Sequence, residues 1–141
     1  MTRLLIFLMT ASPAAAWEFT PGLPCVLRHA SDTAAIELTY DPTQPLYTVT
    51  VSQSAPFDSA PLFSMSFEGD RPLQISTNRH MPSRDGLSVT VADRGFGNVL
   101  NGLQYNERVT ATFGTADVSF SLAGAAPAVA AFRDCRAEAG V

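Results

Sequence analysis

The sequence contains no lysine, only two cysteines and only two histidines, and each shortage narrows what the chain can do. Without lysine, neither a Schiff base nor a lysine general base is possible, and the phosphate-binding motif G-x-x-x-x-G-K-[ST] is absent. The net formal charge is −4. Nonspecific binding to nucleic acid or to anionic lipid requires clustered basic residues. We therefore expect no nucleotide chemistry and no nucleic-acid partner.

The chain also lacks a hydrophobic run of the roughly 20 residues that a membrane-spanning helix needs. Its longest apolar stretch covers residues 4–9, with Arg3 before it and Ala14, Ala15 and Ala16 after it. A cation, a short apolar run and then small residues are typical of a secretory signal peptide, here cleaved before Trp17. We predict a signal peptide over residues 1–16, then a single exported domain over residues 17–141 without an integral membrane span.

Export to an oxidising compartment decides the interpretation of Cys25 and Cys135. Two cysteines allow one intramolecular pairing, and these two are too far apart in sequence to form a C-x-x-C redox or metal motif. We therefore predict a Cys25–Cys135 disulfide. In the chain-entropy model, a loop that encloses most of the chain stabilises the fold by about 4–5 kcal/mol.

Alternation of apolar and polar residues is the pattern that the chain has in abundance. Ile36, Leu38 and Tyr40, for example, alternate with Glu37 and Thr39. Such segments, separated by Pro, Gly and Asp, are typical of half-buried antiparallel strands. The pattern predicts seven strands, at residues 36–40, 48–52, 63–67, 73–76, 87–91, 109–113 and 118–122. An eighth, shorter strand is predicted at residues 25–28. Together they predict an all-β fold, an antiparallel β-sandwich of seven or eight strands.

Two segments interrupt this pattern before the C-terminus. Residues 17–24 contain two prolines and a glycine, and we expect them to be irregular. Residues 96–107 place apolar side chains at helical spacing, but Gly97 and Gly102 disfavour a helix. We therefore expect a loop with at most one helical turn there.

The C-terminal segment has the features of a short helix. Pro127 suits the first helical turn, where its missing N–H has no partner to lose. Ala128, Phe132 and Cys135 would then share one side of the helix. We expect this helix to press Phe132 onto the sheet and to be fastened by the Cys25–Cys135 disulfide.

Residues 70–98 carry half of the arginines of the predicted mature chain, and they allow two interpretations. They form either a solvated hairpin with charged turns or a recognition surface, because arginine binds carboxylate or phosphate through two parallel hydrogen bonds. Phe96 lies between Gly95 and Gly97, and it is either an exposed contact residue or a plug for one end of the sandwich. The candidate interaction surface consists of Arg79, Arg84, Arg94 and Phe96.

Catalytic and metal-binding motifs are absent from the sequence. No serine lies in G-x-S-x-G, and His29 and His80 stand in separate segments without a second ligand nearby. We therefore expect a noncatalytic protein without a cofactor or metal, which binds a protein or glycan partner. One alternative is a small hydrolase with His29 or His80 beside a serine or carboxylate in a pocket. The other is a copper-binding protein that holds Cu(I) through His80 and Met81.

The segment VSFSLAGAAPAVAAFRDC at residues 118–135 resembles the tail of the invasion-associated locus B family. Residues 17–19, 75–77 and 93–100 are similar to a group of uncharacterised envelope proteins of alphaproteobacteria. The resemblance implies that the chain resides in a Gram-negative periplasm. Some similar proteins carry the name of a DNA-repair excinuclease subunit. That activity would need a helicase-type ATPase of several hundred residues, which a short, exported, lysine-free chain cannot form.

Overall fold

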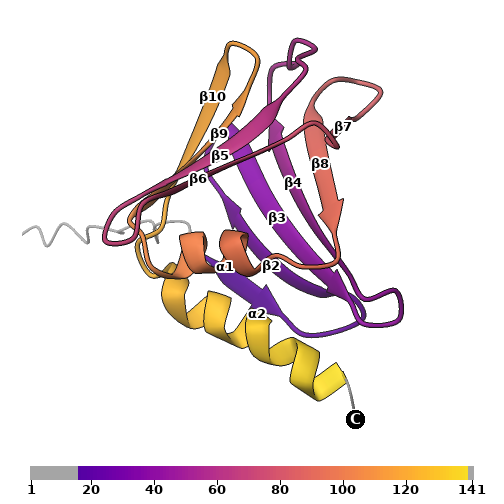
Figure 1. Cartoon of the computed structure of the whole chain (residues 1–141), viewed down its shortest axis with the longest axis vertical. Coiled ribbons are helices and arrows are strands. Elements are labelled where there is room, and N and C mark those ends of the chain that lie inside the picture. Colours follow the sequence, from indigo (N-terminus) through magenta and orange to yellow (C-terminus); the bar gives the residue numbers. More distant parts are fainter. Residues whose placement is uncertain (1–15, 140–141) are drawn as a thin grey trace, which may run out of the picture.

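The computed structural model describes residues 16–139, and β-strands are its main secondary structure (Figure 1). The signal peptide predicted for residues 1–16 lies, apart from Ala16, outside the described residues. The elements are β1 (Glu18–Thr20), β2 (Cys25–Ala30), β3 (Ala34–Asp41), β4 (Leu46–Gln53), β5 (Phe63–Glu68), β6 (Leu73–Thr77), β7 (Met81–Pro82), β8 (Ser88–Asp93), α1 (Gly97–Gln104), β9 (Arg108–Phe113), β10 (Ala116–Ser121) and α2 (Ala125–Ala139).

The strands form two antiparallel sheets, and the prediction of an all-β antiparallel fold with a C-terminal helix is confirmed. The six-stranded sheet has the order β1-β2-β3-β4-β8-β7, and the four-stranded sheet has the order β10-β9-β5-β6. The strands β1 to β4 form a meander in the larger sheet, and the chain then crosses to the smaller sheet for β5 and β6. It returns to the larger sheet for β7 and β8, and β9 and β10 again belong to the smaller sheet. All eight predicted strands are present, and β1 and β7 are additional short ones.

The prediction that residues 17–24 are irregular is wrong for β1. Phe19 lies opposite Leu27 of β2 and packs against the core, which stabilises a three-residue strand that no local pattern would indicate.

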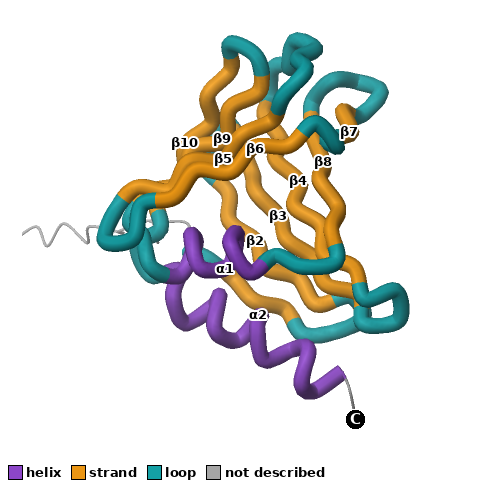
Figure 2. The backbone as a smooth tube through the Cα atoms, viewed as in Figure 1, coloured by secondary structure: helices purple, strands orange, loops and turns teal. Residues whose placement is uncertain are grey.

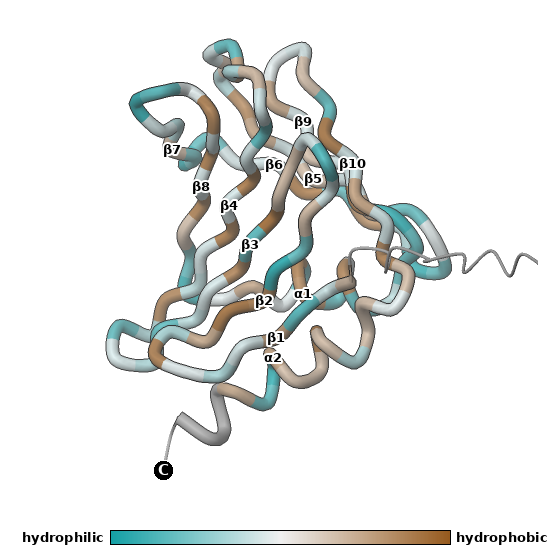
Figure 3. Tube along the Cα trace, turned by 180° about the vertical axis from the view of Figure 1, so that it is seen from behind, coloured by the Kyte–Doolittle hydropathy of each residue, from teal (hydrophilic) through white to brown (hydrophobic). Residues whose placement is uncertain are grey.

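Apolar side chains from the inner faces of both sheets form one core. In the larger sheet, Leu38 of β3 lies opposite Val49 of β4, and Val49 lies opposite Val91 of β8. In the smaller sheet, Met65 of β5 lies opposite both Ile75 of β6 and Ala111 of β9. The alternation of hydrophobic and hydrophilic residues along these strands is visible in Figure 3. A register shift of one residue would turn these apolar sets toward water, so the pattern specifies the pairing.

Both helices lie at the same end of the sandwich and pack against each other (Figure 2). The prediction of a loop with at most one turn at residues 96–107 is wrong, because α1 spans Gly97–Gln104. Burial of Val99, Leu100 and Leu103 in the core offsets the unfavourable helix propensity of the two glycines.

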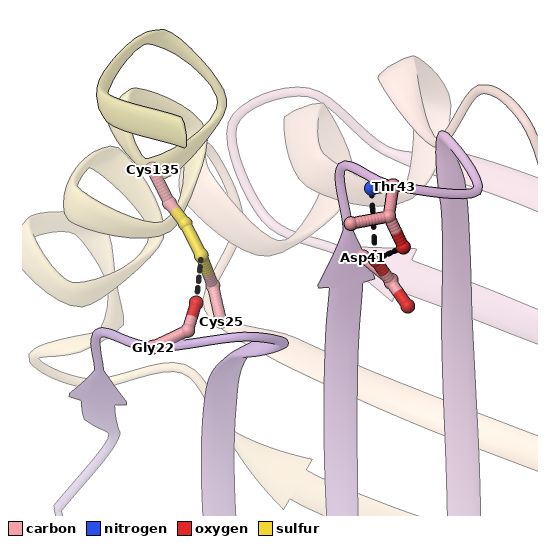
Figure 4. Close-up of a disulfide and its surroundings, with 5 residues drawn as sticks. All are labelled: Gly22, Cys25, Asp41, Thr43 and Cys135. Atoms are coloured by element: carbon pink, nitrogen blue, oxygen red, sulfur yellow. Dashed lines mark hydrogen bonds between the residues drawn. A yellow bond between two sulfur atoms is a disulfide. The ribbon is translucent and has the colours of Figure 1, made fainter. Parts of the chain in front are cut away.

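Helix α2 is longer than the short helix predicted, and it joins the end of the chain to its first strands. Val129 and Phe132 are buried against the core, and Cys135 forms the disulfide with Cys25 at the start of β2 (Figure 4). The two Cα atoms are 6.5 Å apart and 110 positions apart in the sequence. Neither α1 nor α2 has the length and hydropathy of a membrane-crossing helix.

Candidate functional site

The two sheets are closed against each other along the side where β1 and β2 face β10. The indole Nε1 of Trp17 donates a hydrogen bond of 2.8 Å to the carbonyl oxygen of Ser121 at the end of β10. The same indole stacks on the imidazole of His29, with ring centroids 4.9 Å apart, and His29 meets the edge of Phe120. These contacts connect the larger sheet to the smaller one and fill the space between them.

A cleft of about 640 Å³ lies on the opposite side, where β6 faces the end of β8. Its walls are mainly apolar, and a few polar groups surround its mouth. Two apolar lining residues, Ile75 and Val91, are partly exposed. The other apolar lining residues are buried: Val49, Phe63, Met65, Phe96 and Val99. The polar lining residues are Ser76, Thr77, Arg79, Asp93 and Asn98, with Gly95 and Gly97 beside them. Pockets that hold small ligands have this size and this mixture of walls.

The local sequence of each strand explains why the cleft stays open. Ile75 of β6 points inward but is only partly buried, because no described strand pairs with the outer side of β6. On the other sheet, β7 has two residues and pairs only with Val89 and Thr90 of β8. Among the described residues, no strand therefore pairs with that side of residues 91–93 of β8.

Each of the two strands that border the cleft has a stretch of outer edge that pairs with no other strand in the described part of the chain. β6 is the last strand of its sheet, and within the described residues no backbone hydrogen bond reaches it from its outer side. Residues 91–93 of β8 likewise bond only to β4. The cleft thus lies between two strand edges whose outward N–H and C=O groups face solvent, and such groups can pair with another chain.

One cation and one carboxylate stand at the mouth. Arg79 is exposed, and the only ion pair among the described side chains joins Arg28 to Glu37 elsewhere, so the Arg79 guanidinium has no carboxylate partner. At the end of β8, Oδ1 of Asp93 accepts a 2.7 Å hydrogen bond from the backbone N–H of Arg94. A ligand at the mouth could therefore meet the guanidinium of Arg79, which has no described carboxylate partner, and the carboxylate of Asp93, which the Arg94 N–H holds in place.

The structure brings together two of the four residues of the predicted interaction surface. Arg79 and Phe96 line the cleft. Arg94 lies on the exposed loop beside it, whereas Arg84 lies in the turn between β7 and β8 and is not among the lining residues. Phe96 is only 5 % exposed and stacks on Tyr47 at 5.3 Å, so it closes one end of the cleft and presents no open aromatic face.

Both histidines pack against aromatic rings. His29 is 8 % exposed, and it lies between the rings of Trp17 and Phe120. Nε2 of His80 lies 2.8 Å from the carbonyl oxygen of Ala60, and its ring packs against Phe113. No hydrogen bond in the described part of the chain joins either imidazole to a serine or a carboxylate. Within residues 16–139, no three His, Cys, Asp or Glu side chains gather where they could hold a metal ion.

Sequence reasoning missed the residues that form the walls of the cleft. Ile75 and Val91 were expected as ordinary inward-facing core residues of their strands, and the alternating pattern is the same for a core wall and for a cleft wall. Only the strand order, which places β6 at an edge and leaves the end of β8 uncovered, distinguishes the two.

No family model matches the chain, and no significant match was found among curated proteins or among solved structures.

Proposed function

We propose that this chain is an exported, noncatalytic binding protein of the Gram-negative periplasm, which holds a partner in the cleft between β6 and β8. One observation carries the proposal: a cleft with apolar walls lies between two unpaired strand edges, while the other side of the sandwich is filled. Ile75 and Val91 are only partly buried in this cleft, and partly exposed apolar side chains that line a concavity mark candidate sites of ligand or partner binding.

The composition of the cleft favours binding over catalysis. Its polar lining offers hydroxyls, an amide, a carboxylate and a guanidinium, but neither His29 nor His80 is among the lining residues. General acid–base catalysis most often uses histidine, and the one carboxylate of the lining, that of Asp93, has no second acid–base group among the lining residues. No observation specifically favours the hydrolase or the copper-binding alternative.

Between the two partner classes predicted from the sequence, the cleft favours a protein over a glycan. Sugar hydroxyls need hydrogen-bond partners when they are buried, and aliphatic walls such as Ile75 and Val91 supply none. Apolar side chains of a protein would instead gain free energy by leaving water.

The disulfide supports the proposed location. Cys25 and Cys135 are joined between the first strands and the last helix, and disulfides persist in oxidising compartments such as the bacterial periplasm. The predicted signal peptide and the resemblance to envelope proteins point to the same compartment.

Site-specific photocrosslinking in an alphaproteobacterial host tests the proposal. A benzophenone amino acid replaces Ser76 on β6, and a matched variant carries it at Ser119 on β10, an exposed serine on the opposite edge of the same sheet. We expect a discrete adduct from position 76 and none from position 119. Identical adducts at both positions, or no adduct at position 76, would contradict the proposed site.

A further inference from the structure

β6 differs from the other strands that end the two sheets. β1 has three residues and packs against α2, and β7 has two residues and ends in Pro82. β10 carries the charge of Asp117, and its Ser121 carbonyl already accepts the Trp17 indole. These features are among those by which proteins prevent edge strands from pairing with another chain.

β6 has none of these protections. Its sequence, LQIST, contains neither a charge nor a proline. All five residues lie opposite residues of β5 in one continuous antiparallel register. At about 3.3 Å per residue, such a strand presents an edge roughly 17 Å long. An uncharged, unblocked edge of this length can accept another strand.

The cleft lies where the side chains of an added strand would point. Strands in a sheet are about 4.8 Å apart, and alternate side chains point to the same face. A segment paired with the outer edge of β6 would therefore direct every second side chain inward, into the space between Ile75 and Val91. The backbone edge and the apolar walls thus fit one and the same kind of ligand.

We propose, building on the binding role above, that the ligand is an extended polypeptide segment of a partner protein. Its backbone pairs with β6 as an added outer strand of the smaller sheet. Its alternate apolar side chains occupy the cleft. Main-chain hydrogen bonds supply affinity in this mode of recognition, and the pockets for alternate side chains supply specificity.

The charges at the mouth add a preference at one end of the segment. Arg79 follows β6 by two residues, is exposed, and has no described carboxylate partner. An acidic side chain or a terminal carboxylate at that end of the ligand would pair with its guanidinium. The preferred segment therefore alternates aliphatic with small polar residues and carries an acidic group beside Arg79.

Selection from a displayed library of random decapeptides tests this proposal, since no natural ligand is identified. The purified disulfide-bonded chain is the target, and the Ile75→Lys variant, which places a charge in the cleft, is used for counter-selection. Val26→Lys on the outward face of β2 is the matched control for an added lysine at a partly buried position. We expect enriched peptides with alternating aliphatic residues, which bind wild type and Val26→Lys equally but not Ile75→Lys.

Methylation of peptide nitrogens then separates strand pairing from side-chain insertion. The best peptide is resynthesised in two forms, and each form is methylated at a different set of alternate backbone nitrogens. All side chains are kept in both forms, while the methylated nitrogens no longer donate hydrogen bonds. We expect one of the two sets to weaken binding by about tenfold or more. Should Ile75→Lys fail to fold, Arg79→Glu takes its place, because it should shift the preference from acidic to basic peptide ends.

The remaining outcomes distinguish failure of this proposal from failure of the binding role. If the peptide binds equally well after either methylation, strand pairing is overturned but the cleft remains a binding site. The same conclusion follows if the fatty acid dodecanoate binds while no peptide is enriched. Sedimentation as a dimer that Ile75→Lys dissociates would show that a second copy occupies the edge, which also overturns the proposal. Absence of any binding, together with absence of the position-76 adduct, would refute both.

Discussion

Replacement of Gly102 by alanine should destabilise the protein, although alanine is the better helix former. Gly102 lies in α1 directly over the ring of Phe67 on β5. A Cβ added there would lie 2.5 Å from Cγ and 2.6 Å from both Cδ atoms of that ring. Normal contact between carbon atoms is about 3.5–4.0 Å, so the helix or the ring has to move by about 1 Å.

The magnitude follows from two opposing effects. Alanine in place of glycine within a helix gains about 0.8–1.0 kcal/mol. Overpacking a buried site costs about 1–3 kcal/mol, and we expect the upper part of this range because Phe67 is 1 % exposed and surrounded by core residues. The free energy of unfolding should therefore fall by about 1–2 kcal/mol, equivalent to a melting temperature roughly 3–8 °C lower for a domain of this size.

Gly97→Ala in the same helix is the matched control. A Cβ at Gly97 meets no atom within 4 Å, so this substitution should leave stability unchanged or raise it by up to about 1 kcal/mol. Urea denaturation followed by circular dichroism measures both variants. If Gly102→Ala is as stable as wild type or more stable, the close contact between α1 and β5 does not exist.

Three further predictions concern the disulfide, the closed side and a turn. Removing the disulfide with Cys25→Ser and Cys135→Ser together should lower the free energy of unfolding by about 2–5 kcal/mol in a denaturant titration; an unchanged midpoint would exclude the bond. Trp17→Phe keeps an aromatic ring but loses the hydrogen bond to β10, and should cost about 1 kcal/mol in the same assay, whereas no loss would refute that contact. The Ser83 hydroxyl lowers the pKa of the Asp85 carboxyl below its usual 3.8, so this contribution to stability is present above about pH 4 and is lost as the pH falls further. Stability measured between pH 5 and pH 2 (roughly the carboxyl range) should therefore decline less steeply in Asp85→Asn, and an identical slope would count against the interaction.

The fold class could be predicted because the alternating pattern is local. Ile36, Leu38 and Tyr40 specify a strand with one buried face wherever the strand lies in a sheet. The short strand β1 could not be predicted, since Phe19 is a single apolar residue whose strand exists only because β2 pairs with it. Helix α1 was missed because its core contacts outweigh the helix propensity of its glycines.

The site was less predictable than the fold, because strand order is a tertiary property. Arg79 was found through the arginine-rich segment, and its place beside the cleft agrees with one of the two interpretations of that segment. Ile75 and Val91 look like core residues in sequence, and they are partly exposed only because β6 is the last strand of its sheet and β7 covers only the earlier part of β8. Phe96 allowed two interpretations, an exposed contact residue or a plug for one end of the sandwich, and its ring is buried by stacking on Tyr47, as the second interpretation requires.

Amide hydrogen exchange on the free and the peptide-loaded protein tests the central claim most directly, namely that the side of the sandwich between β6 and β8 is where the partner binds. The peptide is the one enriched by selection on the wild-type chain. We predict that bound peptide slows exchange in residues 73–77 and 91–93, while β10 on the opposite edge is unchanged. Slower exchange confined to β10 or α2, with β6 unaffected, would contradict the account.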